Sequence, residues 1–203
     1  MATKFLLWCG VWAGPFYLAV GIAQALLRDG FVFSKHPLSV LTNGPGGWIQ
    51  TVNFVVTGLM VLAAAVGFRR VLGPKPRMTW FLGAYGAAML AAAMFRADPM
   101  DGFPPGTPLG VPTTMSTTGL LHFAAGGVGF VCLAVSCFLA AREMRRRNAA
   151  SLARLSLGSG LIVVVGFFGG AVLPIGGVLG IWLAVVVGWA WLTIMSLRIQ
   201  RLP

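Results

Sequence analysis

The sequence has little charge and very few acidic residues. Only 9% of its 203 residues are charged and four are acidic, whereas 58% are hydrophobic. A soluble domain contains about 25% charged residues, so this chain cannot cover a water-exposed surface. The composition therefore predicts an integral membrane protein. The net charge of +11 does not indicate a nucleic-acid partner, because no soluble basic segment is available to bind one.

Cysteine and histidine are also scarce. The three cysteines, Cys9, Cys132 and Cys137, all lie in apolar segments, where they predict buried apolar side chains rather than a disulfide framework. The only histidines are His36 and His122. The sequence contains no HExxH, HxxxH or GxSxG motif, so it lacks the common signatures of zinc and serine hydrolases. We expect no bound metal and no cofactor.

Long apolar runs dominate what remains. A bilayer core requires about 20 apolar residues per helix. This length predicts six transmembrane helices in one domain over residues 1–203, near 5–27, 49–68, 79–96, 118–141, 155–174 and 177–197. The last two come from one uncharged run that Pro174, Ile175, Gly176 and Gly177 divide, because proline with glycine is typical of a turn. The first run exceeds the 7–15 residues of a signal-peptide core, so we expect it to be a retained helix.

The basic residues predict the orientation of this all-α bundle. Arg28, Lys35 and Arg96 fall on one side of the predicted membrane, and the other twelve of the fifteen basic residues fall on the opposite side. Cytoplasmic segments carry the excess of lysine and arginine. Both termini are therefore expected in the cytoplasm, and Asp29, Asp98 and both histidines outside it.

Two proline- and glycine-rich stretches, 36–53 and 96–122, are expected to form ordered extracytoplasmic loops and the helix starts that follow them. Polar side chains also recur on the outer halves of the helices, for example at Gln50, Asn53 and Thr57 with helical spacing. Such groups avoid lipid, so they predict either a cavity that opens outward or a polar plug. The candidate ligand-binding residues are Ser39, Gln50, Asn53, Arg96, Asp101, Tyr17 and Gln24.

The candidate catalytic residues are His36, Asp98 and His122. A histidine beside a carboxylate can act as a general base, with Ser39 or Ser116 as a nucleophile. Two histidines and two aspartates could alternatively bind Zn²⁺. The sequence spacing also makes a cluster of Arg96, Asp98 and His122 available, with Arg96 at the end of the third helix.

Three segments of the chain resemble a known family. HPLSVLTNGPGGWIQTVNF, DPMDGFPPG and TGLLH are similar to motifs of bacterial six-helix membrane proteins classed as a domain of unknown function. Phe103 stands where a tyrosine is commoner in those proteins. The family is loosely grouped with eukaryotic proteins implicated in lipid-anchor remodelling. The resemblance implies a multi-pass protein of the bacterial plasma membrane that handles lipid.

Three functional hypotheses follow. The first is a protein that binds a membrane lipid or another apolar small molecule in an outward cavity. The second is an intramembrane enzyme that acts on an amphiphile through the His/Asp site. The third is a transporter or a structural membrane factor, although the inner halves of the helices are almost purely apolar and no ionisable residue lies mid-membrane to relay protons or ions. The sequence does not specify a protein partner.

Overall fold

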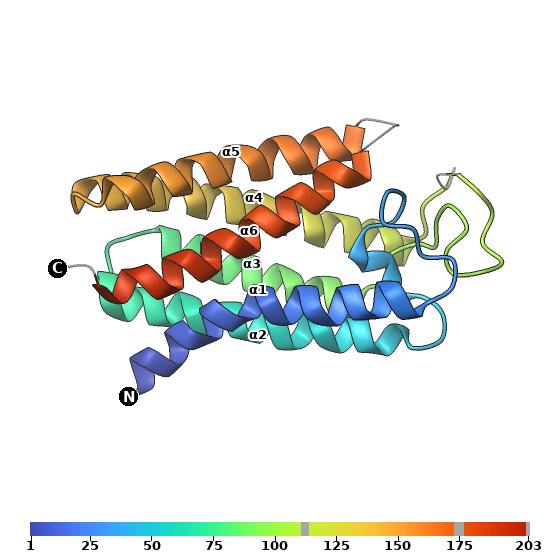
Figure 1. Ribbon diagram of the computed structural model, residues 1–203, viewed down its shortest axis with the longest axis horizontal. Coiled ribbons are helices and arrows are strands. Elements are labelled where there is room, and N and C mark those ends of the chain that lie inside the picture. Colours follow the sequence, from blue (N-terminus) through green and yellow to red (C-terminus); the bar gives the residue numbers. More distant parts are fainter. Residues whose placement is uncertain (111–113, 173–176, 202–203) are drawn as a thin grey trace.

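The computed structural model describes residues 1–110, 114–172 and 177–201, and it has six α-helices (Figure 1). They are α1 (Ala2–Leu27), α2 (Gly47–Leu72), α3 (Met78–Met94), α4 (Thr117–Arg146), α5 (Ala150–Val172) and α6 (Gly177–Arg198), with short 3₁₀ helices η1 (Leu38–Thr42) and η2 (Ile199–Arg201). Within these ranges there is no strand, only one isolated bridge between Met100 and Phe103. The predicted all-helical membrane fold is confirmed, because five helices are long and apolar enough to cross a bilayer. The remaining helix, α3, is also apolar but is shorter, with 17 residues.

The helices form a ring. Each packs against its neighbours in the chain, and α6 returns to pack against α1. Figure 1 shows both termini at one end of the bundle, here called the terminal end. The connection 28–46 and the described residues of the connection after α3, 95–110 and 114–116, lie at the opposite end, here called the loop end. This up-and-down order brings two loops that are distant in the sequence to one place.

Several helices differ in length from the apolar runs that predicted them. α2 continues to Leu72 and α4 to Arg146, because arginine leaves the hydrocarbon core but remains a good helix former. α3 instead ends at Met94, since Phe95 already has an extended backbone. Arg96 therefore lies in the loop and not in the third helix as predicted. Three of the four residues of the turn predicted at Pro174–Gly177, 174–176, lie outside the described residues.

Glycine permits the close contacts of α6 with its neighbours. A Cβ atom at Gly14 of α1 would lie 2.6 Å from the Trp189 Cβ on α6. A Cβ atom at Gly170 of α5 would lie 2.4 Å from the Gly177 carbonyl oxygen. Both contacts are shorter than any side chain tolerates, so these helix pairs pack through backbone.

Pro15 interrupts the hydrogen-bond ladder of α1, because it has no N–H to donate to the Val11 carbonyl one turn earlier. In the structure that carbonyl accepts a hydrogen bond from Thr193 Oγ1 of α6 at 3.1 Å. Membrane interiors offer no water for an unpaired carbonyl, so α6 compensates for the proline in α1.

The half of the bundle near the terminal end is densely filled. Large side chains there have almost no exposed surface, among them Phe68, Met78, Leu82, Trp191 and Met195. This packed layer closes the centre of the ring below the loop end.

Candidate ligand-binding cavity

The loop end is held together by side chains that bind backbone carbonyls. The Arg28 guanidinium, just after α1, donates to the Leu41 carbonyl at 2.6 Å and also to the Asn43 carbonyl. It also lies over the Phe103 ring, 4.9 Å from the ring centroid. Partial burial lowers the pKa of Arg28 from its ordinary value. The Asn43 amide in turn donates to the Ala97 carbonyl at 2.9 Å, which joins the two loops.

His36 also connects the two loops, and its side chain is completely buried. Its Nδ1 accepts a hydrogen bond from the Val32 backbone N–H at 2.9 Å. A ring nitrogen that accepts carries no proton, so the proton is on Nε2, which donates to the Asp101 carbonyl oxygen at 3.1 Å. Phe103 packs against the ring with centroids 5.5 Å apart. Both nitrogens are used in holding the loops, and the partner in the second loop is the Asp101 backbone rather than its carboxylate.

The Asp101 carboxylate has a different set of partners. One oxygen accepts the Gly110 backbone N–H at 2.9 Å, and the other lies 3.3 Å from the Lys35 ammonium. The Gly110 hydrogen bond, followed by the Lys35 ion pair, lowers the pKa of Asp101 below its ordinary value. Asp101 thus stabilises a turn that has a left-handed backbone at its own position (φ 44°).

Asp98 is bound to the start of α4. Its carboxylate accepts the Ser116 backbone N–H at 2.9 Å and the Ser116 hydroxyl, while Ser116 Oγ accepts the Gly119 N–H at 3.0 Å. This places a negative charge at the positive end of the helix dipole. A Cβ atom at Gly119 would lie 2.1 Å from the carboxylate, so only glycine leaves room for this arrangement.

The predicted Arg96–Asp98–His122 cluster is wrong. Arg96 is exposed and forms no ion pair within the described ranges, because α3 ends before it. Asp98 is occupied by Ser116, and His122 by carbonyls of α3. The proposed zinc set fails in the same way, since the described residues contain no group of three His, Cys, Asp or Glu side chains suited to a metal ion.

His122 lies about one turn into α4 and is only 8% exposed. Its Nδ1 lies 3.0 Å from the Ala92 carbonyl oxygen and 2.9 Å from the Phe95 carbonyl oxygen. Carbonyls only accept, so Nδ1 carries the proton and caps the end of α3. The other ring nitrogen, Nε2, has no hydrogen-bond partner among the residues that the structure describes.

The polar residues shared by α1 and α2 form a plug. Gln24 Nε2 donates to Gln50 Oε1 at 2.9 Å, and Asn53 Nδ2 donates to Gln50 Oε1 at 3.2 Å and to the Tyr17 carbonyl at 3.0 Å. Thr57 extends the network by donating to Asn53 Oδ1. Gln24 Oε1 and Gln50 Nε2 are buried without a partner in the described part of the chain. Of this group, only Tyr17 reaches the cavity described next.

A cavity of about 860 Å³ extends from the two loops into the centre of the helix ring. Its mouth is lined by polar and charged side chains, Ser34, Lys35, Ser39, Asp98 and Asp101. Its interior is lined mainly by apolar side chains, both aliphatic and aromatic, together with His122. The aromatic ones are Tyr17, Phe54, Tyr85, Phe123, Phe130, Phe167, Trp182 and Trp189. A ligand with a polar end and an apolar end would match this lining.

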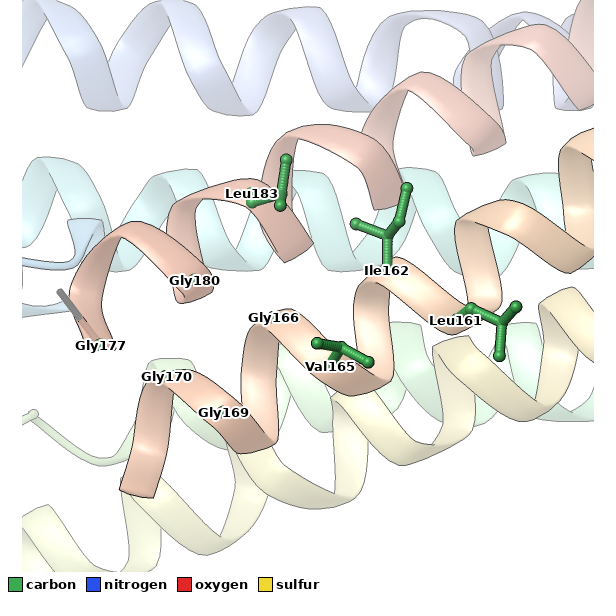
Figure 2. A pocket seen from close by; sticks show the side chains of 9 residues that line it. All are labelled: Leu161, Ile162, Val165, Gly166, Gly169, Gly170, Gly177, Gly180 and Leu183. Atoms are coloured by element: carbon green, nitrogen blue, oxygen red, sulfur yellow. The ribbon is translucent and has the colours of Figure 1, made fainter. Parts of the chain in front are cut away.

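A second hollow, of about 430 Å³, lies between α5 and α6 (Figure 2). It is lined by glycines and by four aliphatic side chains, Leu161, Ile162, Val165 and Leu183, all at least partly exposed. No polar side chain lines it, so it offers nothing to select a ligand, and its shape follows from the glycine contacts of these helices.

Comparison with known protein families gives a match over most of the chain. A family described as "Protein of unknown function (DUF998)" matches residues 11–198. The chain belongs to this family. No curated protein and no solved structure matches it. For this DUF998 protein the site must therefore be argued from its own residues.

The structure thus divides the residues that the sequence singles out. Ser39, Asp98, Asp101, His122 and Tyr17 line the cavity of this DUF998 chain, whereas Gln24, Gln50, Asn53, His36 and Arg96 do not. Sequence reasoning missed the aromatic interior, because aromatic residues in apolar helices usually indicate packing. The only signal was the cluster of Gly126, Gly127 and Gly129 in α4, where a Cβ atom at the first two would meet nothing within 4 Å.

Proposed function

We propose that this protein binds a membrane lipid or another apolar small molecule in the cavity at its loop end. The observation that supports this most is the lining, which is polar and charged at the mouth and apolar inside. Ligand pockets are commonly 300–1,000 Å³ in volume and mostly apolar, with a few polar groups that orient the ligand. The cavity, at about 860 Å³, falls in that range.

The depth of the cavity also suits a lipid. On α4 its lining runs from Gly119 to Phe130, eleven residue steps at 1.5 Å each, or ~16 Å. The hydrocarbon core of a bilayer is about 30 Å thick, so the cavity is about as deep as one leaflet. An acyl chain that enters from the loop end would therefore find apolar contacts below the mouth of the cavity.

The loop end is proposed to face the outside of a bacterial plasma membrane, with both termini in the cytoplasm. Three of the fifteen basic residues, Arg28, Lys35 and Arg96, belong to the loop end, and the others lie toward the terminal end. A cysteine introduced at Thr107 should react with a membrane-impermeant maleimide in intact cells, and one at Asn148 should not. The reverse labelling pattern would place the cavity on the cytoplasmic side.

The other functional hypotheses receive less support. Transport requires a path through the bundle, and the large side chains near the terminal end are completely buried against one another. For catalysis, His36 has both nitrogens occupied, and no histidine forms a hydrogen bond with a carboxylate among the described residues. Binding alone requires neither arrangement.

Two neighbouring glycines provide the test. Gly126 lines the cavity and Gly127 does not, and a Cβ atom at either would meet nothing within 4 Å. Gly126→Leu should fill the cavity, and Gly127→Leu should add the same side chain outside it. Both proteins would be purified in a mild detergent, and the retained lipid would be measured by native mass spectrometry.

We expect the wild-type protein and Gly127→Leu to retain lipid and Gly126→Leu to lose it. Wild-type protein without bound lipid, or equal retention in all three, would contradict the proposal. Thermal unfolding of each variant would show that the loss does not come from unfolding.

A further inference from the structure

We propose that His122 recognises the head group of the bound amphiphile, and that this head group is uncharged and carries a hydroxyl. This inference rests on the proposed lipid binding and specifies its ligand. It starts from one atom, Nε2 of His122, in a ring that lines the cavity and is 92% buried.

The protonation of the ring follows from its neighbours. The Ala92 and Phe95 carbonyl oxygens can only accept, so both contacts require a proton on Nδ1. When the ring is neutral, a proton on Nδ1 leaves a bare lone pair at Nε2. That atom has no donor among the described residues, and its ring lines the cavity, where it is accessible to a ligand. A ligand with a hydrogen-bond donor could bind to it.

The depth of His122 suits a head group. His122 lies five residue steps below the first residue of α4, or ~8 Å along the helix. Above it is the charged mouth, and below it are aromatic side chains such as Phe130 and Trp189. A hydroxyl at this level would leave the acyl chain in the aromatic interior.

The charge of the mouth argues against an anionic head group. Three charged residues line the mouth: Lys35, Asp98 and Asp101. Lys35 forms an ion pair with Asp101, so the negative charge of Asp98 is the one that no ion pair balances among the described residues. A phosphate or carboxylate would face this charge and the lone pair of Nε2, and both repel an anion. A hydroxyl can donate to Nε2 without such repulsion.

Three ligands with the same acyl chain separate these chemistries: 1-monooleoylglycerol, which donates through hydroxyls, methyl oleate, which cannot donate, and oleate, which is anionic. Binding of tritiated 1-monooleoylglycerol to the detergent-solubilised protein, with the other two as competitors, would be measured at pH 8. We expect the wild-type protein to prefer 1-monooleoylglycerol over both competitors by about tenfold, the factor that one hydrogen bond supplies.

Two substitutions separate recognition from the capping of α3. In His122→Asn the amide Nδ2 lies near the position of Nδ1, so it can still donate to α3, but the acceptor is lost. In His122→Gln the amide oxygen can replace the acceptor at Nε2, but the donor to α3 is lost. We expect His122→Asn to keep its unfolding temperature and lose the preference over methyl oleate. His122→Gln should unfold at a lower temperature and keep that preference.

The outcomes are distinct. A wild-type protein that binds none of the three ligands would overturn lipid binding itself, and this inference with it. Binding of all three with equal affinity, or tightest binding of oleate, would leave lipid binding standing and overturn the hydroxyl assignment. A retained preference in His122→Asn would show that His122 only caps α3.

Discussion

His36 and His122 carry their ring protons on opposite nitrogens. His36 accepts the Val32 N–H at Nδ1 and is therefore protonated at Nε2, whereas His122 faces two carbonyls with Nδ1 and is protonated there. The nitrogen that remains determines what each residue can do. His36 donates its Nε2 proton to the Asp101 carbonyl, and His122 keeps Nε2 without a partner in the described structure. One histidine is therefore committed to the fold, and the other retains an atom for a ligand.

The first prediction concerns this structural role of His36. His36→Leu should leave the Val32 N–H and the Asp101 carbonyl without partners in a buried site, at a cost of about 1–3 kcal/mol for each group. The amide of His36→Gln can still donate to the Asp101 carbonyl, so this variant should lose about half as much unfolding free energy as His36→Leu. Thermal unfolding in detergent measures both. If His36→Leu is as stable as the wild type, the two loops are not held together by this ring.

The second prediction is that the protein loses stability in acid because Asp101 becomes protonated. The Gly110 hydrogen bond and the Lys35 ion pair lower the pKa of Asp101 in the folded protein. The ionised carboxylate therefore stabilises the folded state fully above its unfolded pKa of about 3.9, and this contribution is lost as the pH falls through the lower folded value. We expect the unfolding temperature of the wild type to drop below about pH 4 for this reason.

Asp101→Asn is the matched control, because asparagine tolerates the left-handed backbone and can still accept the Gly110 N–H. It cannot ionise, so its unfolding temperature should fall less between pH 5 and pH 3 than that of the wild type. An equal fall in both proteins would show that Asp101 does not account for the acid sensitivity.

A pair of alanine substitutions tests the anchor between Asp98 and α4. Glycine to alanine inside a helix normally stabilises by about 0.5–1 kcal/mol, and Gly127→Ala should follow this rule because nothing lies near its Cβ position. Gly119→Ala should do the opposite, since its methyl group would displace the Asp98 carboxylate and disrupt the cap at Ser116. Loss of a cap costs about 0.5–2 kcal/mol. If both substitutions change the free energy of unfolding in the same direction, the Asp98 carboxylate does not anchor the start of α4.

The sequence was sufficient to predict the six helices and their membrane character, because apolar run length determines them directly. It was not sufficient to predict which polar residues meet. Gln24, Gln50 and Asn53 occupy one face of two neighbouring helices, and that pattern fits a plug as well as a cavity. The distinction depends on packing between helices, which periodicity does not determine.

The error at Arg96 has a similar cause. A hydropathy pattern counts apolar residues and does not register where the backbone leaves the helix, so it placed Arg96 at the end of α3. The helix ends earlier, and His122 caps the freed carbonyls of Ala92 and Phe95. This capping comes from a residue nearly thirty positions away, and no local sequence signal indicates it.

The last prediction uses Pro15 and Thr193 to test the compensation between α1 and α6. Thr193→Val removes the donor to the Val11 carbonyl while nearly preserving shape, and it should lower the free energy of unfolding by about 1 kcal/mol or more. Pro15→Ala restores the N–H that bonds the same carbonyl within the helix. In the Pro15→Ala background, Thr193→Val should therefore cost much less. A double-mutant cycle on unfolding in detergent measures this coupling, expected at about 0.5–1.5 kcal/mol. Strict additivity would mean that the Val11 carbonyl does not depend on α6, and that the α1–α6 contact is held by the glycine packing alone.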